Sequence, residues 1–239
     1  HLMKYYVDLH IHSALSPCGD QDMTPNNIVN MAMLKGLDFI AVTDHNAVGN
    51  VRAVMECAQD KGIVVVPGME VQTSEEVHIL CLFPNLESAV KIENLVQKYL
   101  PPLKNRPDIL GEQIIYNSRD EVIGYTDKLL VTATAMPIHR IKDEVERVGG
   151  VAIPAHIDRN SFSIISNLGF IPHELGFTTV ELSKQVDKTQ YFKQNPSIRK
   201  YNLICNSDAH YLCDISEPEE FVNLQEKNVD HLLHFLRGG

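Results

Sequence analysis

The chain has 239 residues, a length at which one domain can bury a full hydrophobic core. Hydrophobic residues make up 44% of the sequence and charged residues 22%, which is ordinary for a soluble globular protein. Because 31 aspartates and glutamates outnumber 21 lysines and arginines, the net charge is −10, which excludes broad nucleic-acid binding through the overall field.

Short apolar runs alternate with amphipathic segments along the chain. The runs whose length and β-branched content predict strands are 4–9, 39–43, 63–66, 77–82, 151–153, 178–182 and 203–205. Helical spacing of apolar residues predicts helices over 24–33, 51–58, 92–99, 137–148 and 229–236. The proline-punctuated residues 84–136 are expected to form an irregular excursion within a single domain that spans residues 1–239.

This alternation of strands and helices decides the expected fold class. Strands that follow helices in turn predict parallel β/α units, and nearly continuous apolar strands predict a sheet buried on both faces. The sequence therefore predicts an α/β fold, either a barrel or a doubly wound sheet.

The cysteines and the apolar runs indicate the compartment. Five cysteines are scattered without a Cys-x-x-Cys pair, so we predict reduced thiols in a cytoplasmic protein rather than a disulfide framework. No apolar run approaches the ~20 residues that a membrane span needs, so no membrane partner is expected.

Histidines are the most informative residues, since there are eleven of them and no tryptophan. Six lie in or directly after predicted strands, accompanied by two acidic residues: His10, His12, His45, His78, His156 and His210, with Glu70 and Asp208. A single histidine beside an apolar run is usually structural, but six at strand ends are not expected by chance. We expect every one of these groups at the C-terminal edge of its strand, where parallel strands bring their ends to one face.

This set of side chains predicts metal ions. Imidazole and carboxylate donors without a nearby thiolate pair suit Zn, Mn or Fe rather than Ca or Mg alone. The donors exceed what one ion can use, so two or three divalent ions are expected. Clustered ions of this kind serve phosphoryl displacement or the hydrolysis of C–N bonds.

Five short motifs follow one another along the chain: Asp8-Leu9-His10-Ile11-His12-Ser13, Thr43-Asp44-His45-Asn46, Gly68-Met69-Glu70, Pro154-Ala155-His156 and Ser207-Asp208-Ala209-His210. In this order they resemble the motifs of the PHP (polymerase and histidinol phosphatase) family of metal-dependent phosphoesterases, from residue 4 to about residue 210. The resemblance implies a distorted (β/α)7, TIM-like barrel with a metal centre at the C-terminal ends of the strands.

The resemblance also implies which residues hold each ion. A first ion would be held by His10, His12, Glu70 and Asp208. Glu70 would bridge to a second ion, held also by His78 and His156. A third ion would take His45 and His210.

One further ligand of the third ion is open, because the loop after His12 is longer than the resemblance implies. Counting back from Thr24 and Pro25 aligns Asp20 with the missing donor, whereas counting forward from His12 aligns Cys18. We favour Asp20, because a carboxylate suits a hydrolytic ion. A Cys18 thiolate would favour zinc or iron.

The expected reaction is hydrolysis of a phosphomonoester or phosphodiester by a hydroxide that bridges two ions. The residues assigned to the chemistry are Glu70, Asp208 and His210. Arg159, three residues after His156, is the first candidate for binding the substrate phosphate. Asp8 and Asp44 are expected either to orient imidazoles or to cap strand ends.

The acidic charge favours a small phosphorylated metabolite, a nucleotide or a short oligonucleotide as substrate, and argues against a long duplex. Two other functions stay open. One is a metal-dependent C–N hydrolase of the amidohydrolase type, and the other is a non-catalytic scaffold that keeps a PHP-like fold.

Overall fold

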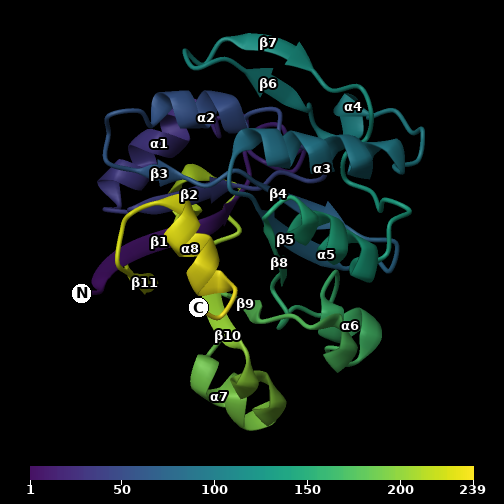
Figure 1. The fold of residues 1–239 in the computed structure, drawn as a ribbon. Coiled ribbons are helices and arrows are strands. Elements are labelled where there is room, and N and C mark those ends of the chain that lie inside the picture. Colours follow the sequence, from purple (N-terminus) through teal and green to yellow (C-terminus); the bar gives the residue numbers. More distant parts are fainter.

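The computed structural model describes residues 1–239 and shows a mixed α/β fold (Figure 1). Along the first half of the chain the elements are β1 (Met3–Ile11), α1 (Pro25–Leu34), β2 (Phe39–Val42), α2 (Val51–Cys57), β3 (Val64–Val65), β4 (Gly68–Gln72), β5 (His78–Leu82), α3 (Leu86–Lys98), α4 (Pro107–Leu110), β6 (Ile114–Tyr116) and β7 (Val122–Tyr125). The second half adds α5 (Ile138–Arg147), β8 (Val151–Pro154), α6 (Ile164–Leu168), η1 (His173–Leu175), β9 (Thr179–Ser183), α7 (Lys188–Gln194), η2 (Pro196–Lys200), β10 (Asn202–Asn206), η3 (Leu212–Asp214), β11 (Phe221–Leu224) and α8 (Val229–Leu236).

The strands form four small sheets. One has the order β11-β1-β2-β3, in which β1, β2 and β3 run parallel and β11 is antiparallel to β1. A second has the order β4-β5-β8, and β9 pairs in parallel with β10. The fourth is the antiparallel hairpin β6–β7. The α/β class is therefore confirmed, although the strands are not all parallel.

The strand β5 departs most clearly from the expected pattern. It runs antiparallel to both of its neighbours, β4 and β8. The predicted strand 63–66 is shortened to β3, and Pro67 separates it from β4, which was not among the predicted strands. Proline lacks the N–H that a continuous ladder requires, which explains the interruption.

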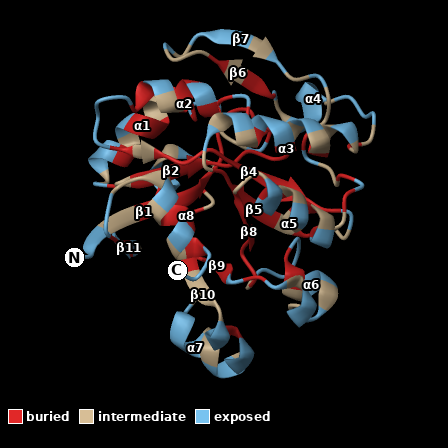
Figure 2. Cartoon of the chain, viewed as in Figure 1, coloured by how far each residue is buried: buried red, intermediate tan, exposed pale blue.

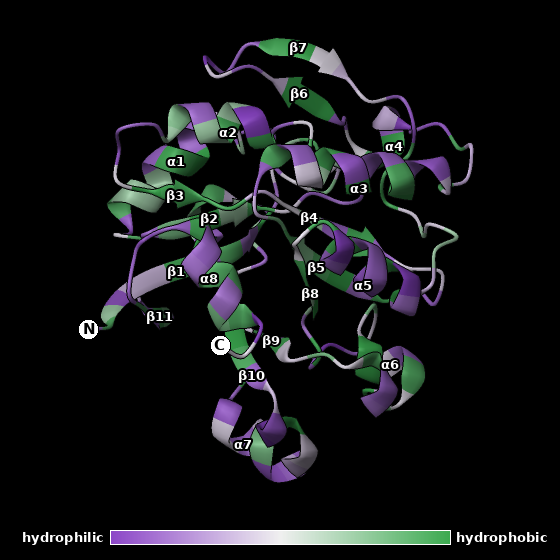
Figure 3. Ribbon diagram, viewed as in Figure 1, coloured by the Kyte–Doolittle hydropathy of each residue, from purple (hydrophilic) through white to green (hydrophobic).

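The central strands are buried on both faces, as the apolar runs predict. All four residues of β2 are fully buried, and the helices cover the sheets with their apolar sides (Figures 2 and 3). In α5, for example, the buried residues Ile138, Ile141 and Val145 recur at helical spacing. None of the helices has the length and apolar character that crossing a membrane requires.

The segment 84–136 is more regular than expected, since it holds α3, α4 and the hairpin β6–β7. The hairpin packs on the loops that follow β1 and β2. The Ile114 N–H donates to the Ala14 carbonyl at 3.0 Å, and the Asn50 side chain donates to the Ile114 carbonyl at 2.9 Å. The excursion thus lies against the loops that carry the candidate site.

Candidate metal centre

The structure brings the predicted ligand residues together from strands and loops distant in the sequence. His10 lies in β1 and His12 just after it, while His45, His156 and Asp208 lie in loops that follow β2, β8 and β10. Two isolated parallel β-bridges of the backbone join these segments. One pairs Ile11 with Ala209, and the other pairs His45 with Glu70.

Two of the ligand candidates are not placed as predicted. Glu70 is the middle residue of β4 rather than a residue after a strand. His78 is the first residue of β5, so it lies at the start of its strand. Because β5 is antiparallel to its neighbours, its N-terminal end meets their C-terminal ends, and His78 reaches the same edge. The expectation that every donor sits at the C-terminal edge of a strand is therefore wrong for Glu70 and His78.

The first group of potential ligands contains His10, His12, Glu70 and Asp208. Asp208 Oδ1 lies 2.9 Å from His12 Nε2 and 3.1 Å from His10 Nε2. Glu70 Oε2 lies 3.1 Å from His10 Nε2. This group has the same members that the motifs predict for the first ion.

The second group contains Glu70, His78 and His156. Glu70 Oε2 lies 3.2 Å from His78 Nδ1 and 3.3 Å from His156 Nε2. This oxygen therefore faces donors of both groups, which is the arrangement that a bridging carboxylate requires.

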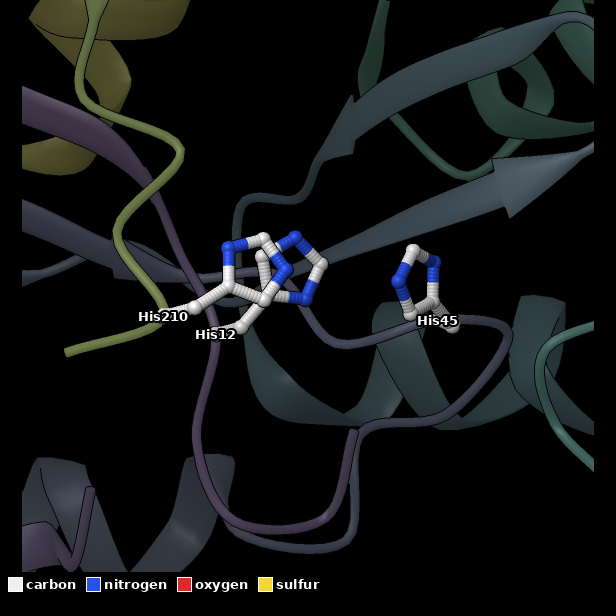
Figure 4. Close-up of side chains that lie close together, drawn as sticks. All are labelled: His12, His45 and His210. Carbon is white, nitrogen blue, oxygen red and sulfur yellow. The ribbon is translucent and has the colours of Figure 1, made fainter. Parts of the chain in front are cut away.

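The third group contains His12, His45 and His210 (Figure 4). The rings of His12 and His210 are stacked, with centroids 4.4 Å apart, and His45 lies beside them. The Cys18 thiol is 3.4 Å from His45 Nε2. Asp20 belongs to none of the three groups, and its backbone N–H donates to the His210 carbonyl. Cys18 is also outside the three groups, but its thiol contacts a member of the third group, whereas no side-chain contact joins Asp20 to any of them.

Several donor atoms at the centre are shielded from solvent and have no hydrogen-bond partner: His10 Nε2, His12 Nε2, His45 Nδ1, His78 Nδ1, Glu70 Oε2 and Asp208 Oδ1. Leaving a buried polar atom without a partner costs about 1–3 kcal/mol, and more for a charged group. Two atoms that ligate one ion at about 2.1 Å in a tetrahedral shell lie about 3.4 Å apart. The distances between donor atoms of the first two groups, 2.9 to 3.3 Å, are close to this value. The donor set therefore fits divalent cations.

The charges of the centre act on one another. Burial opposes ionisation of Glu70, but the charges of His10 and His78 outweigh it and hold the pKa of this carboxyl well below its ordinary value. Burial also opposes protonation of His12, yet the adjacent carboxylates of Asp208 and Glu70 raise its pKa to about 9. Burial lowers the pKa of His45 well below the ordinary value, so its imidazole is neutral. His12 would therefore have to release a proton before it could ligate a cation in the first group.

Glu181 in β9 is a functional candidate that the motifs do not include. It is buried and accepts hydrogen bonds from His10 Nδ1 at 2.9 Å, from the His156 N–H at 2.8 Å and from the Asn206 amide at 2.8 Å. By accepting from Nδ1, it directs Nε2 of His10 toward the first group. One feature of the sequence could have identified Glu181. It is a carboxylate within the run 178–182, a strand that the sequence predicts to be buried on both faces.

The two aspartates next to the ligand histidines have different roles. Asp44 accepts hydrogen bonds from Ser13 and from the Ser16 hydroxyl, which itself pairs with His12 Nδ1 at 2.9 Å. Asp44 therefore orients His12 through Ser16. Asp8 contacts no imidazole, because it accepts from Ser207 and from the Ser216 N–H, so it fixes the loop after β10.

Arg159 is the arginine that reaches the centre. Its Nη1 lies 2.8 Å from Asp208 Oδ2, and its side chain is 42% exposed. Arg106 and Arg119, by contrast, form exposed pairs with Asp108 and Glu121 and do not reach it. A guanidinium that touches a ligand carboxylate and solvent at once is placed to meet an incoming anion.

Backbone strain concentrates at this edge. His156, Asp208 and Phe162 have positive φ angles of 29°, 53° and 53°. Non-glycine residues in this region cost about 1–3 kcal/mol each, and they persist where the surrounding structure fixes them, often at ligand sites.

Comparisons with known proteins identify a family and several similar proteins. A model of the PHP domain family matches residues 8–158. An uncharacterized protein of Methanocaldococcus jannaschii is 31% identical over 101 residues, or 38% of this chain and 59% of that protein. The 3',5'-nucleoside bisphosphate phosphatase of Chromobacterium violaceum is 33% identical over 79 residues, or 32% of this chain and 27% of that protein.

Among solved structures, the lesion-specific endonuclease of Pyrococcus furiosus has a similar fold. It superposes with a TM-score of 0.72 at 18% identity, over 99% of this chain and 56% of that one. Endonuclease Q bound to a 27-mer duplex with an abasic lesion gives a TM-score of 0.71 at 18% identity, over 99% of this chain and 57% of that one. The chain therefore spans less than two thirds of these relatives.

Proposed function

The chain belongs to the PHP domain family, and from this premise we propose that it is a metal-dependent phosphoesterase that hydrolyses phosphomonoesters or phosphodiesters. The observation that carries the proposal is the adjoining set of three donor groups, which share Glu70 and His12 and contain buried atoms without partners. Adjoining cation sites of this kind suit phosphoryl transfer, in which charge develops on several oxygens at once.

Divalent cations, when bound, would neutralise the phosphoryl oxygens and lower the pKa of water. The protein's own residues have three tasks beside them. Arg159 would bind a phosphoryl oxygen that reaches past Asp208. Glu70 and Asp208 would hold their charges fixed in the buried centre. His210 is half-buried and donates Nδ1–H to the Asp208 carbonyl at 2.7 Å, so its Nε2 would ligate the third ion or, without that ion, carry a proton to or from solvent.

The proposed centre holds two or three ions of Zn, Mn or Fe. The first two groups match the ligands of the first and second ions, and the third group supplies His45 and His210 together with His12. We place Cys18 as the further ligand of the third ion, because its thiol contacts His45. A thiolate there selects zinc or iron over manganese.

Replacing Cys18 by serine tests this assignment. With Co²⁺ in the centre, we expect a thiolate-to-cobalt absorption band in the near ultraviolet, because thiolate is the soft donor of the set. The band is expected to disappear in Cys18→Ser and to persist in Asp20→Asn. Cys213→Ser is the matched control, since Cys213 is also an exposed free thiol. Absence of the band from the unaltered protein, together with loss of one ion in Asp20→Asn, would restore Asp20 as the ligand.

We also propose that the strands close into a distorted seven-stranded barrel, as the family resemblance implies, within one domain. The seven strands are β1, β2, β4, β5, β8, β9 and β10. Links outside the sheets support this: the His45–Glu70 bridge between β2 and β4, the hydrogen bond from the Ile157 N–H to the Glu181 carbonyl, and the Ile11–Ala209 bridge.

The proposed substrates are small phosphorylated metabolites, nucleotides and nucleic acid ends. The prediction against long duplexes is not supported, because a structural relative is seen with a 27-mer duplex. A net charge describes the whole surface, whereas bound cations and Arg159 set the field at the centre. Duplex substrates therefore belong in any activity screen.

Phosphate release tests the proposed function. Protein loaded with Mn²⁺ or Zn²⁺ is expected to release phosphate from nucleotides or nitrophenyl phosphates, and a chelator is expected to abolish the reaction. His10→Ala is expected to be inactive, whereas His139→Ala, which alters an exposed histidine of α5, is expected to retain full activity. Full activity in His10→Ala would contradict the proposal, and release of ammonia from C–N substrates instead would favour the amidohydrolase alternative.

A further inference from the structure

An exposed aromatic ring lies beside the candidate metal centre. Phe162 is 43% exposed, and its ring is stacked on the ring of His78, with centroids 5.0 Å apart and an interplanar angle of 23°. One face of the phenyl ring therefore contacts a proposed ligand. Because His78 covers that face, the opposite face is the one on which another planar group could stack.

The backbone holds this ring in place. Phe162 has a φ of 53°, which is a true outlier for a bulky side chain. Its carbonyl accepts the His78 N–H at 3.2 Å. The next residue, Ser163, caps α6 and donates its hydroxyl to the Arg159 carbonyl at 2.7 Å. The strained conformation is thus fixed from both sides, which is how strain persists at ligand sites.

The same loop carries two groups that reach the centre. Arg159 contacts Asp208, and Phe162 contacts His78, so a cation and an aromatic face both border the three donor groups. A phosphate bound at the centre would leave the rest of its molecule near this loop. A planar, apolar group attached to that phosphate has an exposed aromatic face on which to stack.

We propose that Phe162 stacks on the nucleobase of the substrate, so that the centre selects nucleoside phosphates or nucleic acid ends over sugar phosphates that lack a base. This inference rests on the proposed function, because it assumes a phosphate held at the metal centre. Base–aromatic stacking is worth about 5- to 150-fold in Kd when it is measured by alanine substitution. His78 stiffens the ring from behind, so little side-chain freedom is lost on binding.

Binding to metal-loaded protein tests the inference, with non-hydrolysable phosphonate analogues of adenosine 5'-phosphate and ribose 5-phosphate as probes in calorimetry. With the ribose analogue fixed as its 1-O-methyl riboside, the two probes share the furanose ring and the phosphonate and differ in the group at C1: a base in one and a methoxy group in the other. The unaltered protein is expected to bind the adenosine analogue about tenfold more tightly. Phe162→Ala is expected to reduce this preference to about twofold or less and to leave the Kd of the ribose analogue unchanged, whereas Phe162→Trp is expected to keep the preference.

Phe170→Ala is the matched control, since Phe170 follows α6 and is 61% exposed. Metal content, measured on every variant, reports whether His78 has kept its place. Equal Kd values for the two probes in the unaltered protein would overturn the inference. So would an equal loss for both probes in Phe162→Ala, because Phe162 would then act only through His78. Failure of the proposed function is seen separately, as absence of phosphate release from nitrophenyl phosphates as well as from nucleotides.

Discussion

Glu70→Gln is expected to lower kcat/KM for phosphate release by about 10³-fold or more, which corresponds to about 4 kcal/mol of transition-state stabilisation. The carboxylate faces His10 in the first group and His78 and His156 in the second. Glutamine keeps the shape but removes the charge, and its amide nitrogen cannot bind a cation. Both proposed ions lose a ligand in one substitution, so the bound metal per chain, measured by elemental analysis, is expected to fall together with activity.

The matched control is Glu56→Gln, which alters an exposed glutamate of α2 and is expected to change neither quantity. A variant with glutamine at position 70 that retained its full metal content and activity would remove Glu70 from the centre. Full metal content with lost activity would make its charge, rather than its ligation, the essential contribution.

Glu181→Gln is expected to weaken metal binding by about 10- to 100-fold, although Glu181 belongs to none of the donor groups. Asn206 cannot rotate to accommodate an amide, because its oxygen accepts the Leu9 N–H at 2.9 Å. A glutamine that still accepts the His156 N–H therefore turns its own NH₂ toward the Asn206 NH₂. Two donors then face each other in a buried site, and the acceptor for His10 Nδ1 is weakened.

The same substitution is expected to lower the free energy of unfolding by about 1–3 kcal/mol, because it leaves a buried donor without a partner. Metal titration and chemical denaturation measure the two effects. Glu174→Gln, an exposed glutamate of η1, is the control and is expected to change neither. If Glu181→Gln destabilises the chain while metal affinity stays constant, Glu181 is structural and does not position His10.

The fold was predictable where local pattern and tertiary environment agree. The N-terminus of α1 is an example, because Thr24 caps the helix and Pro25 occupies its first turn, as the sequence predicts. The direction of β5 was not predictable, since an apolar run predicts a buried strand without its orientation. The hairpin β6–β7 was missed because three of the four residues of β7, Val122, Ile123 and Tyr125, are exposed, so the run shows no alternation.

The candidate site was predictable as far as side-chain chemistry repeats in recognisable motifs. All members of the first two donor groups except His78 lie in the motifs, and the structure brings them together with His78. The loop after β1 was not predictable, because its extra residues leave two alignments, and only the fold brings Cys18 to His45. Glu181 and Phe162 act through contacts across the fold, with His10 and His78, which spacing along the chain does not reveal.

The position of β1 has a consequence for how the molecule is assembled. One edge of β1 pairs with β2, which follows it closely, while its other edge pairs with β11 and its end bridges to Ala209, near the far end of the chain. The contact between Leu9 and Asn206 joins residues 197 positions apart. A ribosome must therefore synthesise most of the chain before Asp208 can meet His10, and until then the early histidines lack their late carboxylate. Closure of this part of the fold and assembly of the full donor set thus both wait for the segment around residue 208, and a chain cut short before it has the first four motifs but not the centre.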